Sequence, residues 1–281
     1  MPWLTENVPL AGRRELSAWR SLALATWRDV SAASVPAVLE IDAEPMLRFL
    51  ERESARAGVR VTMVHAVGRA AAEILRRLPD VNCLVRLGGL YRRRNADVFF
   101  PVALDEAGED LSGYVVRDAD RKALVEIACE LAEAARRMRL SGGDPGYSGL
   151  RGAGFARRVL ARLVLRAGGL VLFTLNRWSP VLGLPRNAFG SVAVTDISKF
   201  GADWAYPPLL PFARLPFLLG VGPVVDRPVL DGGTWRVQRT LRLIVVFDHR
   251  VIDGVYGGRM ARLLRDLFAD PERHFGAGTP A

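Results

Sequence analysis

The order of strand-like and helix-like segments most constrains the fold of this 281-residue chain. Alternating or β-branched runs predict strands, and apolar residues recurring about every 3.6 positions predict helices. Strands are predicted at 34–41, 83–87, 90–94, 98–104, 190–195, 218–225 and 241–248, and helices at 16–28, 43–57, 62–78, 120–139, 155–175 and 255–268. Because the segments alternate without a regular βαβ repeat, we predict a single α/β domain with helices packed on a mixed sheet.

Local signals place the ends of several elements. Asp42 is a plausible N-cap for the second helix, and Gly58 would stop it. Gly88-Gly89 indicates a hairpin turn. Residues 1–15 are predicted to be an irregular lead-in, and 141–149 a loop.

The positive charge of the chain is concentrated in one segment. The chain has 39 basic and 30 acidic residues, a formal charge of +9, and all but two of the basic residues are arginine. Such a bias can come from base composition, so we do not predict nucleic-acid binding. Residues 150–187 contain no acid and seven arginines: Arg151, Arg157, Arg158, Arg162, Arg166, Arg177 and Arg186.

Composition argues against several other classes. Cys83 and Cys129 are far apart, and the chain has three histidines, so we predict neither a disulfide framework nor a metal site. We expect a reducing, cytoplasmic compartment, because no signal-peptide core is present. No apolar run reaches the ~18 residues of a membrane span.

The sharpest local motif lies at residues 242–260, RLIVVFDHRVIDGVYGGRM. A β-branched strand delivers Asp248 and His249, and Asp253-Gly254 precedes a helix. A histidine at a strand end is held rigidly, and its usual pKa of about 6.5 suits a general base. Taken alone, the pattern also fits a capped turn without catalysis.

The motif and four further blocks together resemble a known family. HRVIDG is similar to the HxxxDG motif of the 2-oxo-acid dehydrogenase acyltransferases and of chloramphenicol acetyltransferase. Further blocks resemble the same family in order: LRRLPDVN (75–82), VRDADRKALVEIACELAEAARR (116–137), VAVTDISKFG (192–201) and LLGVGPVVDRPV (218–229). The resemblance covers residues 16–275, apart from an Arg-rich amphipathic insertion at about 150–187. It implies a chloramphenicol acetyltransferase-like fold.

The resemblance implies acyl transfer between a thioester and a thiol of coenzyme A or dihydrolipoamide. His249 would be the general base, and the hydroxyl of Thr195 would donate to the developing oxyanion. The less favoured alternative for Thr195 is an ordinary β-branched strand residue. Coenzyme A would be a substrate; the residues that bind it are not identified.

Three supporting residues surround this pair. The family pairs its motif Asp with an Arg of the N-terminal helix, which makes Arg20 the candidate partner of Asp253, although Arg13, Arg14 and Arg28 are close in sequence. Gly254 is expected to allow tight packing after the acid. Asp248 is also family-like and could satisfy a backbone group.

The sequence departs from the family in two respects. Asp196 stands where the family has Asn, and Ser198 stands where it has Gly. An acid there could repel acidic acyl groups or face away. The chain also has no lipoylation motif, so we expect a free-standing catalytic domain without a covalent lipoyl group.

The remaining histidines and the arginine run at 92–94 have ordinary structural interpretations. His65 and His274 are expected to be structural or exposed, and the arginines at 92–94 to form a solvated face or to meet coenzyme A phosphates. The family implies a homotrimer with active sites between subunits. Two alternatives are a non-catalytic trimeric scaffold of the same fold and a condensation-type acyltransferase. Peripheral contact with anionic lipid through 155–184 is a further alternative, and the sequence does not favour it. The insertion is expected to pack on the trimer, cap the substrate channel or meet an acidic surface.

Overall fold

A mixed six-stranded sheet forms the centre of the computed structural model, which describes residues 4–27, 29–104, 111–141, 155–182, 185–201 and 204–276. The strand order is β3-β11-β10-β9-β6-β7. β9 runs parallel to both of its neighbours, and the other adjacent pairs are antiparallel. The strands are β3 (Ser34–Asp42), β6 (Val98–Ala103), β7 (Leu111–Val116), β9 (Val192–Asp196), β10 (Phe217–Asp231) and β11 (Thr234–Asp248). The predicted fold class is therefore confirmed.

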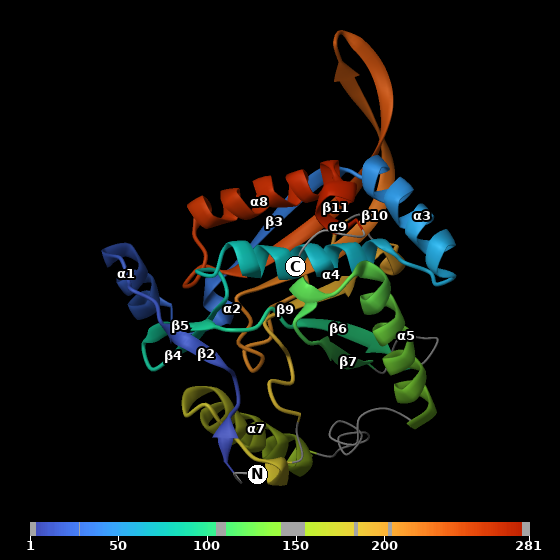
Figure 1. The fold of residues 1–281 in the computed structure, drawn as a ribbon. Helices are drawn as coiled ribbons and strands as arrows, with labels where there is room; N and C mark the ends of the chain where they lie inside the picture. The colour runs from blue at the N-terminus through green and yellow to red at the C-terminus, as the bar shows by residue number, and fades with distance from the viewer. Residues whose placement is uncertain are drawn as a thin grey trace.

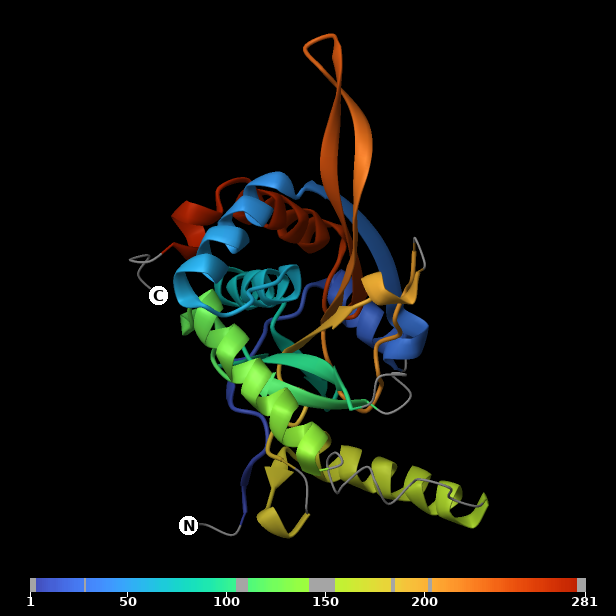
Figure 2. The same ribbon diagram turned by 90° about the vertical axis from the view of Figure 1, so that its right-hand side faces the viewer.

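Helices cover one side of this sheet (Figures 1 and 2). They are α3 (Glu44–Ala57), α4 (Met63–Arg77), α5 (Leu124–Ser141) and α8 (Gly254–Ala269), with the short α9 (Pro271–Phe275) after α8. α3 ends at Gly58, whose φ of 65° is easy for glycine, as predicted. Asp42 lies one residue before the N-cap, Ala43, and its carboxylate accepts from the backbone N–H of Glu44.

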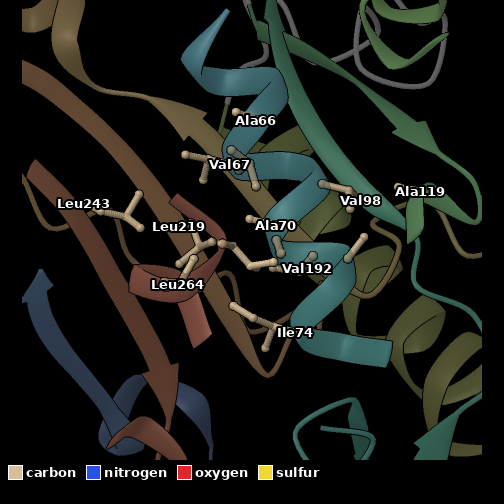
Figure 3. Packing of buried hydrophobic residues seen from close by; sticks show 14 of the residues in the cluster. Ala66, Val67, Ala70, Ile74, Val98, Ala119, Val192, Leu219, Leu243 and Leu264 are labelled. Carbon is tan, nitrogen blue, oxygen red and sulfur yellow. The ribbon is translucent and has the colours of Figure 1, made fainter. Parts of the chain in front are cut away.

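The main core lies between α4 and the sheet (Figure 3). Ala66, Ala70 and Ile74 of α4 are fully buried, and they face strand residues that include Val98 and Leu219. Short alanine side chains let the helix approach the sheet closely. The periodicity of 62–78 therefore predicted both the helix and its buried face.

The N-terminal prediction was wrong, because residues 5–13 pair with distant strands. β2 (Leu10–Arg13) joins β5 (Gly89–Arg93) and β4 (Cys83–Arg86) in a three-stranded sheet. β1 (Thr5–Glu6) pairs with β8 (Arg177–Trp178). The β4–β5 turn is Leu87-Gly88, both with positive φ, one residue earlier than predicted.

Two further elements differ from the prediction. β7 was not predicted. Strands β10 and β11 each have 15 residues and form a hairpin that projects from the sheet (Figures 1 and 2). The outer half of the hairpin was not predicted, because its apolar residues alternate with polar ones. Only the buried halves, at 218–225 and 241–248, have the continuous apolar run that predicts a strand.

The first and fourth predicted helices, at 16–28 and 120–139, are shorter than expected. α1 covers Ala18–Thr26 and is followed by the single turn α2 (Val30–Ala33). A 3₁₀ turn, η1 (Ala119–Arg121), precedes α5, so the helix predicted from residue 120 begins at Leu124.

The Arg-rich segment forms a helix that leaves the body of the protein. α7 spans Phe155–Gly169 and continues into a π-helical turn, η2 (Leu170–Thr174), with the 3₁₀ turn η3 (Pro180–Leu182) after β8. Leu172 and Phe173 anchor the turn in a small core with Val8 and Leu84. Of the helices described, none is both long and apolar enough to cross a membrane. The loop predicted at 141–149 lies outside the described residues beyond Ser141.

Candidate active site

The backbone at the end of β11 holds His249 at a fixed place. The N–H of His249 donates to Ala33 O at 2.9 Å, and the N–H of Asp248 donates to Pro216 O at 2.9 Å. The Asp248 carboxylate accepts from the backbone N–H of Arg250 and from its guanidinium. Asp248 thus satisfies a backbone group, one of the roles considered for it, and also forms a buried ion pair that closes the turn.

Arg20 of α1 forms hydrogen bonds to the same turn, including its last residue, Asp253. Its Nη2 donates to Asp253 Oδ2 at 2.5 Å, and its Nη1 donates to the carbonyl oxygens of His249 and Arg250 at 3.3 and 3.4 Å. Arg20 is only 2% exposed, and burial lowers its pKa although the Asp253 carboxylate opposes that shift. The pairing expected between Arg20 and Asp253 is therefore present.

Asp253 has a second role as the N-cap of α8. Its Oδ1 accepts from the backbone N–H of Tyr256 at 3.0 Å. One carboxylate thus joins the start of α8 to α1 and to the His249 turn. At Gly254, by contrast, the expected tight packing is absent among the described residues, since a Cβ added there would meet none of their atoms within 4 Å.

Aromatic rings surround the imidazole of His249. Trp27 stacks on it with ring centroids 5.2 Å apart and planes 24° apart, while Trp19 and Phe247 present their edges. His249 Nδ1 is buried, and no hydrogen-bond partner occurs for it among the residues described. Neither Trp19 nor Trp27 was predicted to lie at the site. Their spacing of eight residues, about two helical turns, is the sequence signal that places them on similar sides of the first helix.

A cavity of about 330 Å³ lies beside the turn. Its lining includes Asp248, Arg250 and Val251, together with Arg86 and Arg214. Burial lowers the pKa of Arg214, and the nearby charges of Arg250 and Arg86 lower it further. The carboxylates of Asp29 and Asp248 line the same cavity, and Arg250 is already paired with Asp248, so the lining carries both signs of charge.

Thr195 lies near the end of β9 and pairs with Gly220 of β10. The next residue, Asp196, accepts from the N–H and hydroxyl of Ser198 at 3.0 and 2.6 Å. The two departures from the family are thus one unit, because the serine satisfies the added carboxylate.

Within one chain, Thr195 and His249 are not neighbours. Gly220 pairs with Thr195 on one side and with Ile244 on the other, and Ile244 lies five residues before His249. With about 3.3 Å per residue along a strand and 4.8 Å between strands, the two residues are roughly 15–20 Å apart. The structure brings Arg20, Asp248, His249 and Asp253 together and leaves Thr195 apart.

The other predicted polar residues have structural partners. His65 Nδ1 accepts from the N–H of Thr62 in a capping box, and burial lowers the pKa of His65 to about 4. The Nε2 atom of His274 lies 3.3 Å from Asp266 Oδ2. Arg93, expected on a solvated face, is only 4% exposed and donates to Gly190 O and Arg214 O, which corrects that prediction. In the described part of the chain, no cluster of side chains is suited to a metal ion.

Comparisons with known proteins agree on one family. The family described as 2-oxoacid dehydrogenases acyltransferase (catalytic domain) matches residues 5–144 and 188–275, passing over residues 145–187. The acetyltransferase component of the pyruvate dehydrogenase complex of Pseudomonas aeruginosa is 27% identical over 84% of this chain and 37% of its own length. The corresponding component of the acetoin cleaving system of Bacillus subtilis is 22% identical over 95% and 56%. The chain thus spans only about a third to a half of these relatives.

Solved structures show the same fold. The dihydrolipoamide acetyltransferase of Azotobacter vinelandii superposes with a TM-score of 0.65 at 23% identity, covering 93% of both chains. A chloramphenicol acetyltransferase superposes with a TM-score of 0.51 at 11% identity, covering 91% of this chain and 99% of its own. With the sequence match over most of the chain, these findings show that the protein belongs to the 2-oxoacid dehydrogenase acyltransferase family, through its catalytic domain.

Proposed function

We propose that the protein is an acyltransferase that moves an acyl group between coenzyme A and a dithiol of the dihydrolipoamide type, with His249 as general base. The observation that carries this proposal is the clamp on the His249 turn. Arg20 holds Asp253 and two carbonyl oxygens of the turn, and the ring itself rests on Trp27. A turn without catalytic work has no need of a buried cation and an aromatic platform directed at one imidazole.

The chemistry follows from the ring's surroundings. Because Nδ1 of His249 is buried, Nε2 is the nitrogen that can meet a substrate. A free thiol has a pKa of about 8.5 and is mostly protonated near pH 7, so a base raises its reactivity. Nε2 takes the thiol proton while the sulfur attacks the thioester carbonyl, and the imidazolium returns that proton to the leaving thiolate.

The oxyanion of the tetrahedral intermediate needs a hydrogen-bond donor, which we assign to Thr195. A donor of this kind is typically worth about 3 kcal/mol of the barrier. Because Thr195 and His249 of one chain are too far apart, the donor comes from a second copy of the chain. We therefore propose a homotrimer with each active site between two subunits.

The projecting hairpin supports association between copies. Its outer part exposes Leu230, Trp235 and Val237. An isolated two-stranded hairpin is only marginally stable in water, so an apolar partner that covers these side chains would stabilise it. A neighbouring subunit offers such a partner.

The test measures acyl transfer from acetyl-CoA to dihydrolipoamide with purified protein. We expect His249→Ala and Thr195→Ala each to lower kcat/KM at least 100-fold, while His274→Ala serves as the control histidine and stays near wild type. Mixing the two inactive variants under conditions that exchange subunits should restore part of the activity, because some interfaces then contain both intact residues.

Each outcome separates the candidates. A wild-type protein that forms trimers without transferring acyl groups would be the scaffold alternative. Activity that survives His249→Ala removes the proposed base. Two inactive variants that never complement each other, although subunits exchange, would place both residues in one chain and contradict the shared site.

A further inference from the structure

We infer that α7, with the turn η2 that anchors it, is an arm that binds the surface of membranes containing anionic lipid. The family match passes over residues 145–187, so this arm is an addition to the catalytic domain. Figure 2 shows α7 projecting beyond the rest of the ribbon.

Exposure around one full turn of α7 is the first observation. Residues 163–167 are all exposed, and five consecutive residues cover more than one full turn of 3.6 residues. Leu163, Val164 and Leu165 are 56%, 60% and 48% exposed. The described body of the protein therefore leaves this stretch of the helix uncovered, and its apolar side chains require some other apolar environment.

The same end of the molecule carries more apolar surface. Leu160 of α7, Leu170 of η2, and Leu175 and Val181 further along are also exposed. The base of the arm is firmly held: Asn176 exchanges hydrogen bonds with the backbone of Val8, and η2 buries Leu172 and Phe173. The apolar surface is thus presented by an anchored element about 22 Å long, from a rise of 1.5 Å per residue.

The charge of the arm indicates which kind of partner covers its apolar side chains. α7 contains four arginines and no acid, within a segment of seven arginines and no acid. A second copy offers a poor partner, since its own arm carries the same positive charge and its other residues contain 32 basic against 30 acidic side chains. A membrane of anionic lipid offers phosphate groups to the arginines and acyl chains to the leucines and valines.

The arm lies on such a membrane instead of crossing it, because no described helix is long and apolar enough to span one. The guanidinium groups would stay among the headgroups while the apolar side chains enter the region just below them. This placement leaves the His249 turn, which is built from β11, α1 and α8, outside the membrane contact.

The experiment measures co-flotation of the intact protein with phosphatidylcholine vesicles, with or without phosphatidylserine. We expect binding only to the vesicles that contain phosphatidylserine, and release at 1 M salt, where the Debye length is about 3 Å. Each arginine near an anionic surface is worth about a fivefold change in partition, so neutralising three should lower binding about 100-fold.

The arm variant replaces Arg158, Arg162 and Arg166 with Gln. Its matched control replaces Arg52 and Arg56 of α3 and Arg60, which follows α3, with Gln and loses the same charge. A second variant, Leu163→Glu with Leu165→Glu, tests the apolar contribution against Leu230→Glu on the hairpin. Circular dichroism checks that all four variants fold.

Equal loss of flotation by the arm variant and its charge control would overturn the proposal, because net charge would then explain the binding. Absence of flotation for the wild type would also overturn it. So would a result in which the arm variants change the molecular mass in solution and leave vesicle binding as it was, since the arm would then be a contact between copies. Acyl transfer is not used as the readout, so the result is independent of the proposed reaction.

Discussion

Replacing Arg20 with methionine removes the cation that holds the His249 turn while keeping a side chain of similar length. Three contacts are lost: the ion pair with Asp253 at 2.5 Å and two longer hydrogen bonds to backbone carbonyl oxygens. The carboxylate of Asp253 then stays behind beside an apolar side chain. The change tests directly whether this pair fixes the turn.

The expected loss of stability follows from burial. Removing one partner of a fully buried ion pair costs about 3–5 kcal/mol. The side chain of Asp253 is 25% exposed and keeps its hydrogen bond to Tyr256, so water compensates in part. We therefore expect Arg20→Met to lower the free energy of unfolding by about 2 kcal/mol. Because the turn loosens, kcat/KM should fall about 10- to 100-fold, an effect of roughly 1.4–2.7 kcal/mol.

The assay is chemical denaturation at one fixed protein concentration, because association between copies also contributes to stability. Arg13→Met, on an exposed arginine of β2, is the control and should stay within about 0.5 kcal/mol of wild type. A double-mutant cycle with Asp253→Asn, which keeps the cap of α8, isolates the pair. A coupling energy below about 0.5 kcal/mol would refute the reasoning.

Three further predictions concern other parts of the structure. Burial alone would raise the pKa of Glu73, but hydrogen bonds from three arginines lower it to about 2. The ionised carboxylate therefore contributes about 3 kcal/mol at most to the free energy of unfolding, in full above pH 4.5 and not at all once the pH has fallen through 2. Glu73→Gln should accordingly destabilise most near neutral pH, which denaturation measured across this pH range checks. Gly68→Ala should destabilise the protein by about 1–3 kcal/mol, because the added Cβ would lie 2.3 Å from the ring of Phe100. Gly257→Ala should instead stabilise it by about 0.5–1 kcal/mol, because the space around Gly257 is open and alanine favours the helix. Thermal unfolding of the two variants checks whether the changes in stability have opposite signs. Trp27→Leu should lower kcat/KM about three- to tenfold through loss of the stacked ring, while unchanged kinetics would show that the platform has no part in the reaction.

The sequence predicted those elements whose local pattern agrees with their final burial. The helix at 62–78 has an apolar face of small residues, and that face is the one buried against the sheet. Gly58 ends α3 because glycine accepts a positive φ at little cost. The HxxxDG turn was found in the same way, from residues adjacent in sequence.

The errors fall where a distant segment decides the conformation. Residues 5–13 have no strand pattern of their own, yet they form β1 and β2 because Trp178 and the β5 edge supply partners. Arg93 sits in a run of three arginines that suggests a solvated face, but carbonyl groups of residues 190 and 214 receive its guanidinium. Gly254 shows the reverse, since its place in the motif suggested tight packing that the described part of the chain does not provide.

The sequence by itself predicted the family, the helices with a clear apolar face, and the grouping of His249, Asp253 and Arg20, because these depend on local order and on a motif. Only the tertiary structure decided that Trp27 supports the imidazole, that Thr195 and His249 lie far apart in one chain, and that residues 163–167 of α7 are exposed. The physical reason is that burial, ion pairing and strand register depend on groups brought together from distant parts of the chain. A pattern in sequence records which side chains need partners, and the fold determines which partners they receive.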